Sequence, residues 1–264
     1  MNDLLEGLLA DLHAEGDQLY AAVSGLDDSA VGGWATPTPA AGWTVATQVA
    51  HLLWTDETAT TAATDKAAWD EIVLAAIADP NGYVDTYAHE IARLEPRALL
   101  ARWGAARAAL AEALRGFPEG ERMPWFGPPM SPASMATARF METWAHALDV
   151  YDALGLRPEP TNRIRHVAHL GVRTRNFSFG VHGLEPPAEE FRVELTAPSG
   201  DQWAWGPEDA AQRVTGSALD FCLRVTQRIH RNDTDLVAEG ADAEKWLTIA
   251  QAFAGPPGEG RAAT

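Results

Sequence analysis

The hydrophobic periodicity of this chain changes once, at the proline-containing segment around Pro158 and Pro160. Before this segment, apolar residues recur at the three- and four-residue spacing of amphipathic helices. Beyond it, helical stretches are mixed with short segments in which apolar and polar residues alternate, as they do in half-buried strands. A length of 264 residues accommodates two domains of ordinary size. We therefore predict an α+β fold with two domains, residues 1–157 and 158–264.

Four helices separated by loops rich in glycine and proline are expected in the first domain, which predicts a four-helix bundle. The first helix spans residues 2–23. The second begins after the N-cap Thr44 and precedes a break at residues 79–82. Pro96 opens the third, which ends at residues 116–118, and Ser131 with Pro132 opens the fourth, which Gly155 terminates.

The second domain is predicted to be a smaller α/β domain. Residues 191–196 alternate apolar with polar side chains, and residues 202–205 follow after a turn, so the two segments predict a β-hairpin. Residues 217–230 and 243–253 are predicted as helices on either side of a short strand at residues 235–238.

Charge and composition exclude several classes of partner. The net charge of −17, from 37 acidic and 20 basic residues, repels phosphate backbones and anionic lipids. We therefore expect neither nucleic acid nor membrane as a partner. The N-terminal residues lack the features of a secretory signal, and the single cysteine, Cys222, excludes an internal disulfide. A cytoplasmic location is the expectation.

Glu142 and His146 have the spacing of two metal ligands on one helix. Residues four apart leave the same helix face about one turn apart. His51, on the second predicted helix, is the natural third donor if the two helices are neighbours in a bundle. The apolar residues around Glu142 leave little exposed surface, and a buried carboxylate needs a compensating cation. A solvated Glu–His pair without a metal is the alternative.

Asp149 continues the same polar stripe by another turn. It could accept a hydrogen bond from a ligand imidazole, serve as a catalytic base, or form a salt bridge with an arginine. Other candidates are weaker. His166 and His169 are surrounded by arginines and lack a carboxylate at helical spacing, so we interpret them as surface or interface residues. Cys222 lies on the apolar side of a helix, where a thiol is a poor nucleophile.

Two motifs resemble the signatures of the DinB-like, mycothiol-dependent maleylpyruvate isomerase family. They are Gly42-Trp43-Thr44-Val45 followed by His51-Leu52, and Glu142-Thr-Trp-Ala-His146-Ala-Leu-Asp149. The resemblance implies a DinB-like bundle that binds zinc through His51, Glu142 and His146, followed by a smaller domain similar to a sterol-carrier fold. It also implies that Arg228 faces the active site from the second domain.

Arg228 has a structural alternative, since Arg224 and Arg231 lie nearby. These arginines would then form a basic helix end that pairs with its own terminal carbonyls and with Asp233 and Asp235.

Three protein ligands leave open positions on a metal, as in catalytic sites. The family resemblance implies that a low-molecular-weight thiol, mycothiol or an analogue, is the co-substrate of an isomerase or a thiol transferase, with Arg228 binding a carboxylate of a small substrate. Zn²⁺ is the favoured ion, and Fe²⁺ or Ni²⁺ are alternatives. The donor set also suits a hydrolase that uses metal-activated water, or an Fe²⁺ oxygenase. A non-enzymatic protein that binds a hydrophobic ligand is a further alternative. The substrate and the oligomeric state stay open.

Overall fold

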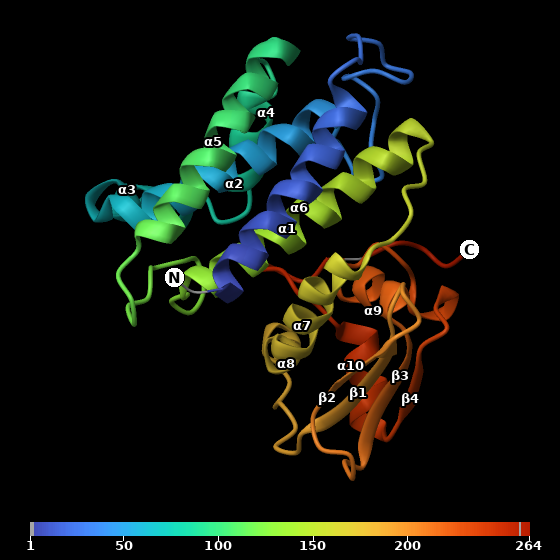
Figure 1. The fold of residues 1–264 in the computed structure, drawn as a ribbon. Coiled ribbons are helices and arrows are strands. Elements are labelled where there is room, and N and C mark those ends of the chain that lie inside the picture. Colours follow the sequence, from blue (N-terminus) through green and yellow to red (C-terminus); the bar gives the residue numbers. More distant parts are fainter. Residues whose placement is uncertain (1–2, 259) are drawn as a thin grey trace. The chain divides into compact units, whose positions relative to one another are not determined.

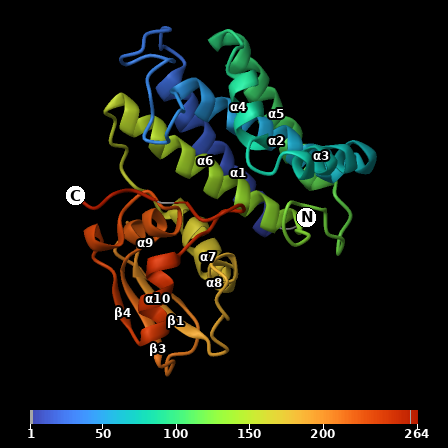
Figure 2. The ribbon, with the colours of Figure 1, turned by 180° about the vertical axis from the view of Figure 1, so that it is seen from behind.

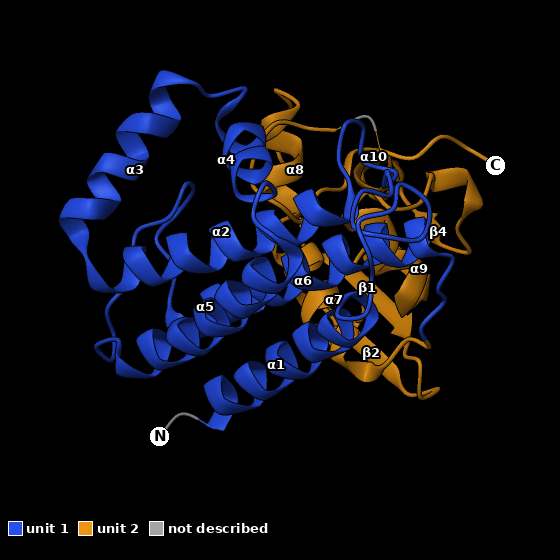
Figure 3. Cartoon of the chain, turned by 90° about the horizontal axis from the view of Figure 1, so that it is seen from above, with its two compact units in different colours: residues 1–158 blue, residues 159–264 orange. Residues whose placement is uncertain are grey.

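The computed structural model describes residues 3–258 and 260–264, and it confirms the predicted α+β fold. The chain forms two compact units, residues 1–158 and residues 159–264 (Figure 3). The first unit is helical, and the second combines helices with one four-stranded sheet. No helix within the described residues is long and apolar enough to cross a bilayer.

Four long helices build the first unit (Figures 1 and 2). They are α1 (Asp3–Val23), α2 (Val45–Thr64), α5 (Pro96–Gly116) and α6 (Pro132–Leu154). Helix α1 packs against α6, and α2 packs against both α5 and α6. The core between them is apolar, with fully buried side chains that include Leu19, Val49, Leu53, Trp103 and Val150.

Two further helices lie between α2 and α5, and the sequence analysis did not predict them as separate elements. They are α3 (Lys66–Ala78) and α4 (Tyr83–Ile91). Asp65 is the reason that α2 and α3 are distinct, because its backbone is extended and its carboxylate accepts a hydrogen bond from the Ala68 N–H, as an N-cap residue does.

Capping contacts confirm two of the predicted helix starts in the first unit, those of α2 and α6. The predicted start of the first helix at residue 2 lies outside the described residues. Thr44 and Thr47 form a reciprocal capping box at the start of α2. The Ser131 hydroxyl accepts from the Ser134 N–H, with Pro132 in the first turn of α6. Gly155 ends α6 with a φ of 69°, a left-handed conformation that glycine adopts without a steric penalty.

The second unit contains a mixed sheet with the strand order β2-β1-β3-β4. Its elements are, in chain order, a 3₁₀ turn (Asn162–Ile164), α7 (Arg165–Arg173), α8 (Arg175–Val181), β1 (Phe191–Thr196), β2 (Gln202–Trp205), β3 (Gln212–Ser217), α9 (Ala218–Val225), a second 3₁₀ turn (Arg231–Asp233), β4 (Val237–Glu239) and α10 (Ala241–Ile249). The β1–β2 hairpin is confirmed, with Val193 opposite Trp205. Strand β3 was not predicted, although it lies parallel to β1 inside the sheet.

Helix α9 ends five residues earlier than its predicted end at His230. Gln227 adopts a φ of 61°, and the backbone N–H groups of Gln227 and Arg228 donate to the carbonyls of Arg224 and Leu223. This pair of bonds closes the helix in a Schellman motif. Arg228 therefore lies in the turn that follows α9 and not on the helix itself.

Candidate metal centre

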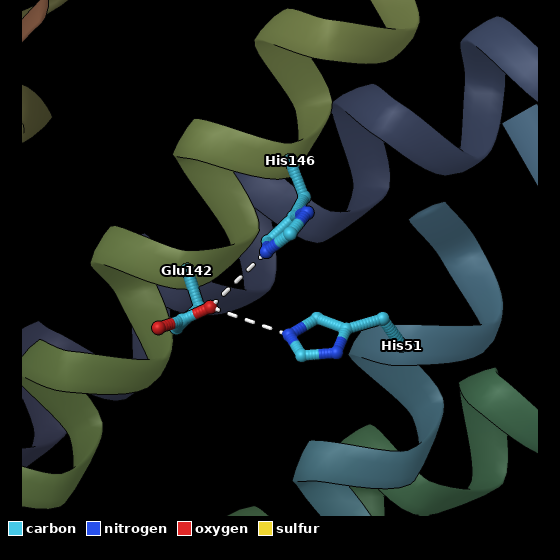
Figure 4. Close-up of side chains that lie close together, drawn as sticks. All are labelled: His51, Glu142 and His146. Carbon is cyan, nitrogen blue, oxygen red and sulfur yellow. Dashed lines mark ion pairs between the residues drawn. The ribbon is translucent and has the colours of Figure 1, made fainter. Parts of the chain in front are cut away.

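Two helices of the first unit bring His51, Glu142 and His146 together (Figure 4). His51 lies in the second turn of α2, and Glu142 and His146 lie one turn apart on α6. Glu142 Oε2 is 3.5 Å from His51 Nε2 and 3.2 Å from His146 Nε2. One donor atom from each residue lies within 4.8 Å of the other two, and no other set of three His, Cys, Asp or Glu donors in the described part of the chain converges in this way.

The ionisation of the three donors suits a cation. Burial, with a smaller effect from the neighbouring His146, lowers the pKa of His51 to about 4, although Glu142 acts in the opposite direction. Burial alone would raise the pKa of Glu142, but the neighbouring imidazoles of His146 and His51 hold that pKa well below its usual range. At neutral pH, His51 is therefore a neutral imidazole and Glu142 is a carboxylate, which are the forms that bind metals.

Gln48 orients the His146 ring and was not identified in the sequence. Its amide nitrogen donates to Thr38 Oγ1 at 2.9 Å, so its amide oxygen faces His146 Nδ1 and accepts the proton there. This hydrogen bond leaves the Nε2 lone pair of His146 directed at Glu142. The signal in the sequence was the position of Gln48, three residues before His51 and one turn away on the same helix.

Aromatic side chains enclose the two imidazoles. Trp43 stacks on His146, with ring centroids 5.8 Å apart and an interplanar angle of 20°. The Trp43 indole N–H donates to Asp85 on α4 at 3.0 Å. Trp54 lies 5.8 Å from the His51 ring and also contacts Tyr87 of α4. The short helix α4 thus supports the aromatic residues beside the donor set.

The remaining predicted site residues lie in different environments. Asp149 is on α6, three residues beyond His146, and only 3% of its surface is exposed. Arg228 belongs to the second unit, where its Nη1 donates to the Thr226 carbonyl at 2.7 Å. The structural alternative for the basic cluster holds for Arg228, which binds a carbonyl at its own helix end. It is wrong for Arg231, which pairs with Glu244 and not with Asp233 or Asp235.

The nearby Arg224 is structural, because it donates to the Leu247 and Thr248 carbonyls. His169 accepts a hydrogen bond from Trp205 and belongs to no converging donor set among the described residues. Cys222 is fully buried, and burial raises the pKa of its thiol well above the usual range. Its exclusion as a nucleophile is therefore supported by its environment.

The fold and the site define a helical-bundle protein in which two imidazoles and one carboxylate converge from two neighbouring helices. Residues 12–151 match the model of the mycothiol maleylpyruvate isomerase N-terminal domain. The chain therefore belongs to the mycothiol maleylpyruvate isomerase family, and the resemblance that its two motifs carry is confirmed. Residues 187–239 match a second model, described as wyosine base formation.

Two relatives in Mycobacterium tuberculosis, both described as uncharacterized proteins, are 58% identical over 253 residues, which cover 96% of this chain and 97% of theirs. They come from strains CDC 1551 / Oshkosh and H37Rv. Among solved structures, the mycothiol-dependent maleylpyruvate isomerase matches with a TM-score of 0.56 and 16% identity, over 89% of this chain and 92% of that chain. A mutant of that enzyme matches with a TM-score of 0.57 and 17% identity over the same shares. These two structures share the fold of this chain.

Proposed function

We propose that this protein is a metal-dependent enzyme that uses a low-molecular-weight thiol of the mycothiol type. Its reaction is either the isomerisation of a small carboxylated substrate or the transfer of the thiol to that substrate. The observation that carries the proposal is the convergence of His51, Glu142 and His146. Family membership supports the choice of a thiol as the co-substrate and of isomerisation as the reaction.

The donor set fits a divalent cation. With the proton of His146 held on Nδ1 by Gln48, the Nε2 lone pair and the Glu142 carboxylate oxygen face each other at 3.2 Å. Two lone pairs at this separation repel unless a proton or a cation lies between them. Two imidazoles and one carboxylate are a zinc ligand set that leaves positions open for a reactant, so Zn²⁺ is our preferred ion.

The chain supplies binding and positioning. When bound, the ion provides the Lewis acidity that lowers the pKa of a thiol and favours its thiolate at neutral pH. His51, Glu142 and His146 hold the ion, and Trp43 excludes water from one side of His146 by stacking on it. We propose that Arg228 binds a substrate carboxylate, and that Asp149 either accepts a hydrogen bond from a ligand imidazole or moves a proton as a base.

The test combines elemental analysis with calorimetry on the full chain. We expect one divalent ion per chain, lost when His51, Glu142 or His146 becomes alanine. Titration of mycothiol into the metal-loaded protein should release a proton, so the observed heat should depend on the ionisation enthalpy of the buffer. The metal-free protein should bind the thiol more weakly and without this dependence.

Two outcomes would contradict the proposal. Wild-type metal content in all three alanine variants would remove the metal site. Equal affinity of the thiol for the loaded and metal-free forms would show that the thiol does not react at the metal. If the metal-loaded protein binds no thiol, the preferred function becomes a hydrolase with metal-activated water, which the same donor set suits.

A further inference from the structure

A buried ion pair joins α2 to α6 near the candidate metal centre. Arg139 of α6 is 1% exposed and Asp56 of α2 is 3% exposed, and Arg139 Nε lies 3.0 Å from Asp56 Oδ1. Trp103 of α5 donates its indole N–H to the other carboxylate oxygen at 3.2 Å. The carboxylate of Asp56 on α2 therefore has partners on both α5 and α6.

The Arg139 guanidinium is also linked to the backbone of His51, a proposed metal ligand, through the hydroxyl group of Thr55. Arg139 Nη2 donates to Thr55 Oγ1 at 2.6 Å, and the Thr55 hydroxyl donates to the His51 carbonyl oxygen at 2.8 Å. Arg139 thus makes two bonds from a single rigid fork, one to the side chain of Asp56 and one to the residue that is bonded to His51.

The spacing on both helices places this polar layer directly beside the donor layer. On α6, Arg139 precedes Glu142 by three residues and His146 by seven, so all three share one helix face. On α2, Thr55 follows His51 by four residues and shares its face. Helices α2 and α6 are therefore in contact at two successive levels, the buried ion pair and the metal donors. The position of the side chains at one level constrains those at the other.

We infer that Arg139, with Asp56 and Thr55, is a positioning residue that sets the register of α2 against α6, at which His51 meets Glu142 and His146. This inference rests on the proposed metal site. Metal ligands must be held within about 0.5 Å of their productive positions, and a ligand set divided between two helices depends on the register of those helices.

Fold stability alone is a weak reason for a buried ion pair in this place. Removing two charges from water costs several kcal/mol, and apolar residues of similar volume often stabilise a core equally well. A register role makes a different demand, because two nitrogens of the planar Arg139 guanidinium bind Asp56 and Thr55 at the same time and in a fixed geometry. A lysine keeps the charge but presents a single ammonium.

Three variants of the full chain separate these roles, with Zn²⁺ and Co²⁺ as the probes. Arg139→Lys keeps the charge without the fork. The double variant Asp56→Leu with Arg139→Met removes both charges and keeps an apolar core of similar volume. Arg102→Met is the matched control. It breaks the exposed ion pair between Arg102 of α5 and Glu57 of α2, so it also removes an arginine partner of α2.

We expect Arg139→Lys and the double variant to bind Zn²⁺ about 10–100-fold more weakly than the wild type, as is typical when residues that orient metal ligands are replaced. Their Co²⁺ complexes should show altered visible absorption, which reports the ligand geometry. Arg102→Met should match the wild type in both measurements. Thermal unfolding of the metal-free proteins identifies any variant that fails to fold, and the double variant is chosen so that one folded variant without the fork is available.

The outcomes separate the inference from the proposed function. A wild-type protein that binds neither ion overturns both. A wild-type protein that binds metal, with wild-type affinity and an unchanged Co²⁺ spectrum in the folded double variant, overturns the inference alone. Loss of affinity in Arg102→Met equal to that in Arg139→Lys would also overturn it, because the effect would then not be specific to the buried pair.

Discussion

At the residue scale, the imidazole of His146 depends on a neutral partner. Gln48 accepts the Nδ1 proton, and its own amide nitrogen is held by Thr38. An amide at this position fixes the tautomer without adding a second negative charge beside Glu142. The donor set consequently keeps a single carboxylate, and His146 presents its Nε2 lone pair to the site.

Replacing Gln48 should therefore weaken metal binding without removing a ligand. In Gln48→Leu the His146 Nδ1 proton loses its acceptor, and we expect Zn²⁺ affinity to fall about 10–100-fold. Gln48→Glu retains an acceptor oxygen for the Nδ1 proton, although it adds a negative charge, so its affinity should stay above that of Gln48→Leu. Competition titrations with a zinc-binding dye would measure both. Equal affinities of Gln48→Leu and the wild type would show that Gln48 does not orient the ring.

At the element scale, the ends of the helices are set by individual residues with specific backbone conformations. Helix α6, which carries two of the three donors, ends at Gly155 with a φ of 69°. The N–H groups of Gly155 and Leu156 donate to the carbonyls of Asp152 and Tyr151, which closes the helix. A Cβ at Gly155 would meet no neighbouring atom, so the cost of a side chain there is conformational.

Two glycine substitutions with opposite expected signs test this account. Gly155→Ala should reduce the free energy of unfolding by about 1 kcal/mol, because a left-handed conformation penalises a side chain. Gly104→Ala, inside α5 and also without a neighbour for its Cβ, should raise that free energy by about 0.5–1 kcal/mol. Urea unfolding curves would measure both. A stabilised Gly155→Ala protein would contradict the conformational argument.

At the scale of the whole molecule, the two units contribute different chemical groups. The first unit holds the three converging donors, and the second carries Arg228 in the turn after α9. Gln227 adopts a left-handed backbone conformation, with a φ of 61°, and this ends α9 before Arg228. In a chain with a net charge of −17, an arginine that binds substrate would counter the overall repulsion of an anionic substrate.

Arg228→Ala should lower kcat/KM roughly 10–100-fold for a carboxylated substrate, since a hydrogen bond to a charged group contributes about 1.5–3 kcal/mol. Metal content should stay unchanged, because Arg228 is not a ligand. A maleyl-type diacid and its ester would be compared, and the loss should be confined to the diacid. Arg173→Ala, which removes an exposed arginine of α7, is the control. An equal loss on diacid and ester would exclude carboxylate binding by Arg228.

Local sequence determined the features that depend on neighbouring residues along the chain. The capping residues Thr44 and Ser131 marked the starts of α2 and α6, and the spacing of Glu142 and His146 placed both on one helix face. The alternation at residues 191–196 predicted β1 because strand periodicity is also local. The α+β class and the family followed from these patterns.

Only the tertiary structure decided which faces meet. Strand β3 has one fully buried residue, Val214, so its periodicity was too weak to reveal a strand that pairing with β1 and β4 stabilises. The contact between Gln48 and His146, and that between Asp56 and Arg139, join residues that are 98 and 83 positions apart. Periodicity fixes the direction of a side chain from its own helix, whereas the register between two helices depends on how their side chains pack, and this packing brings His51 to α6.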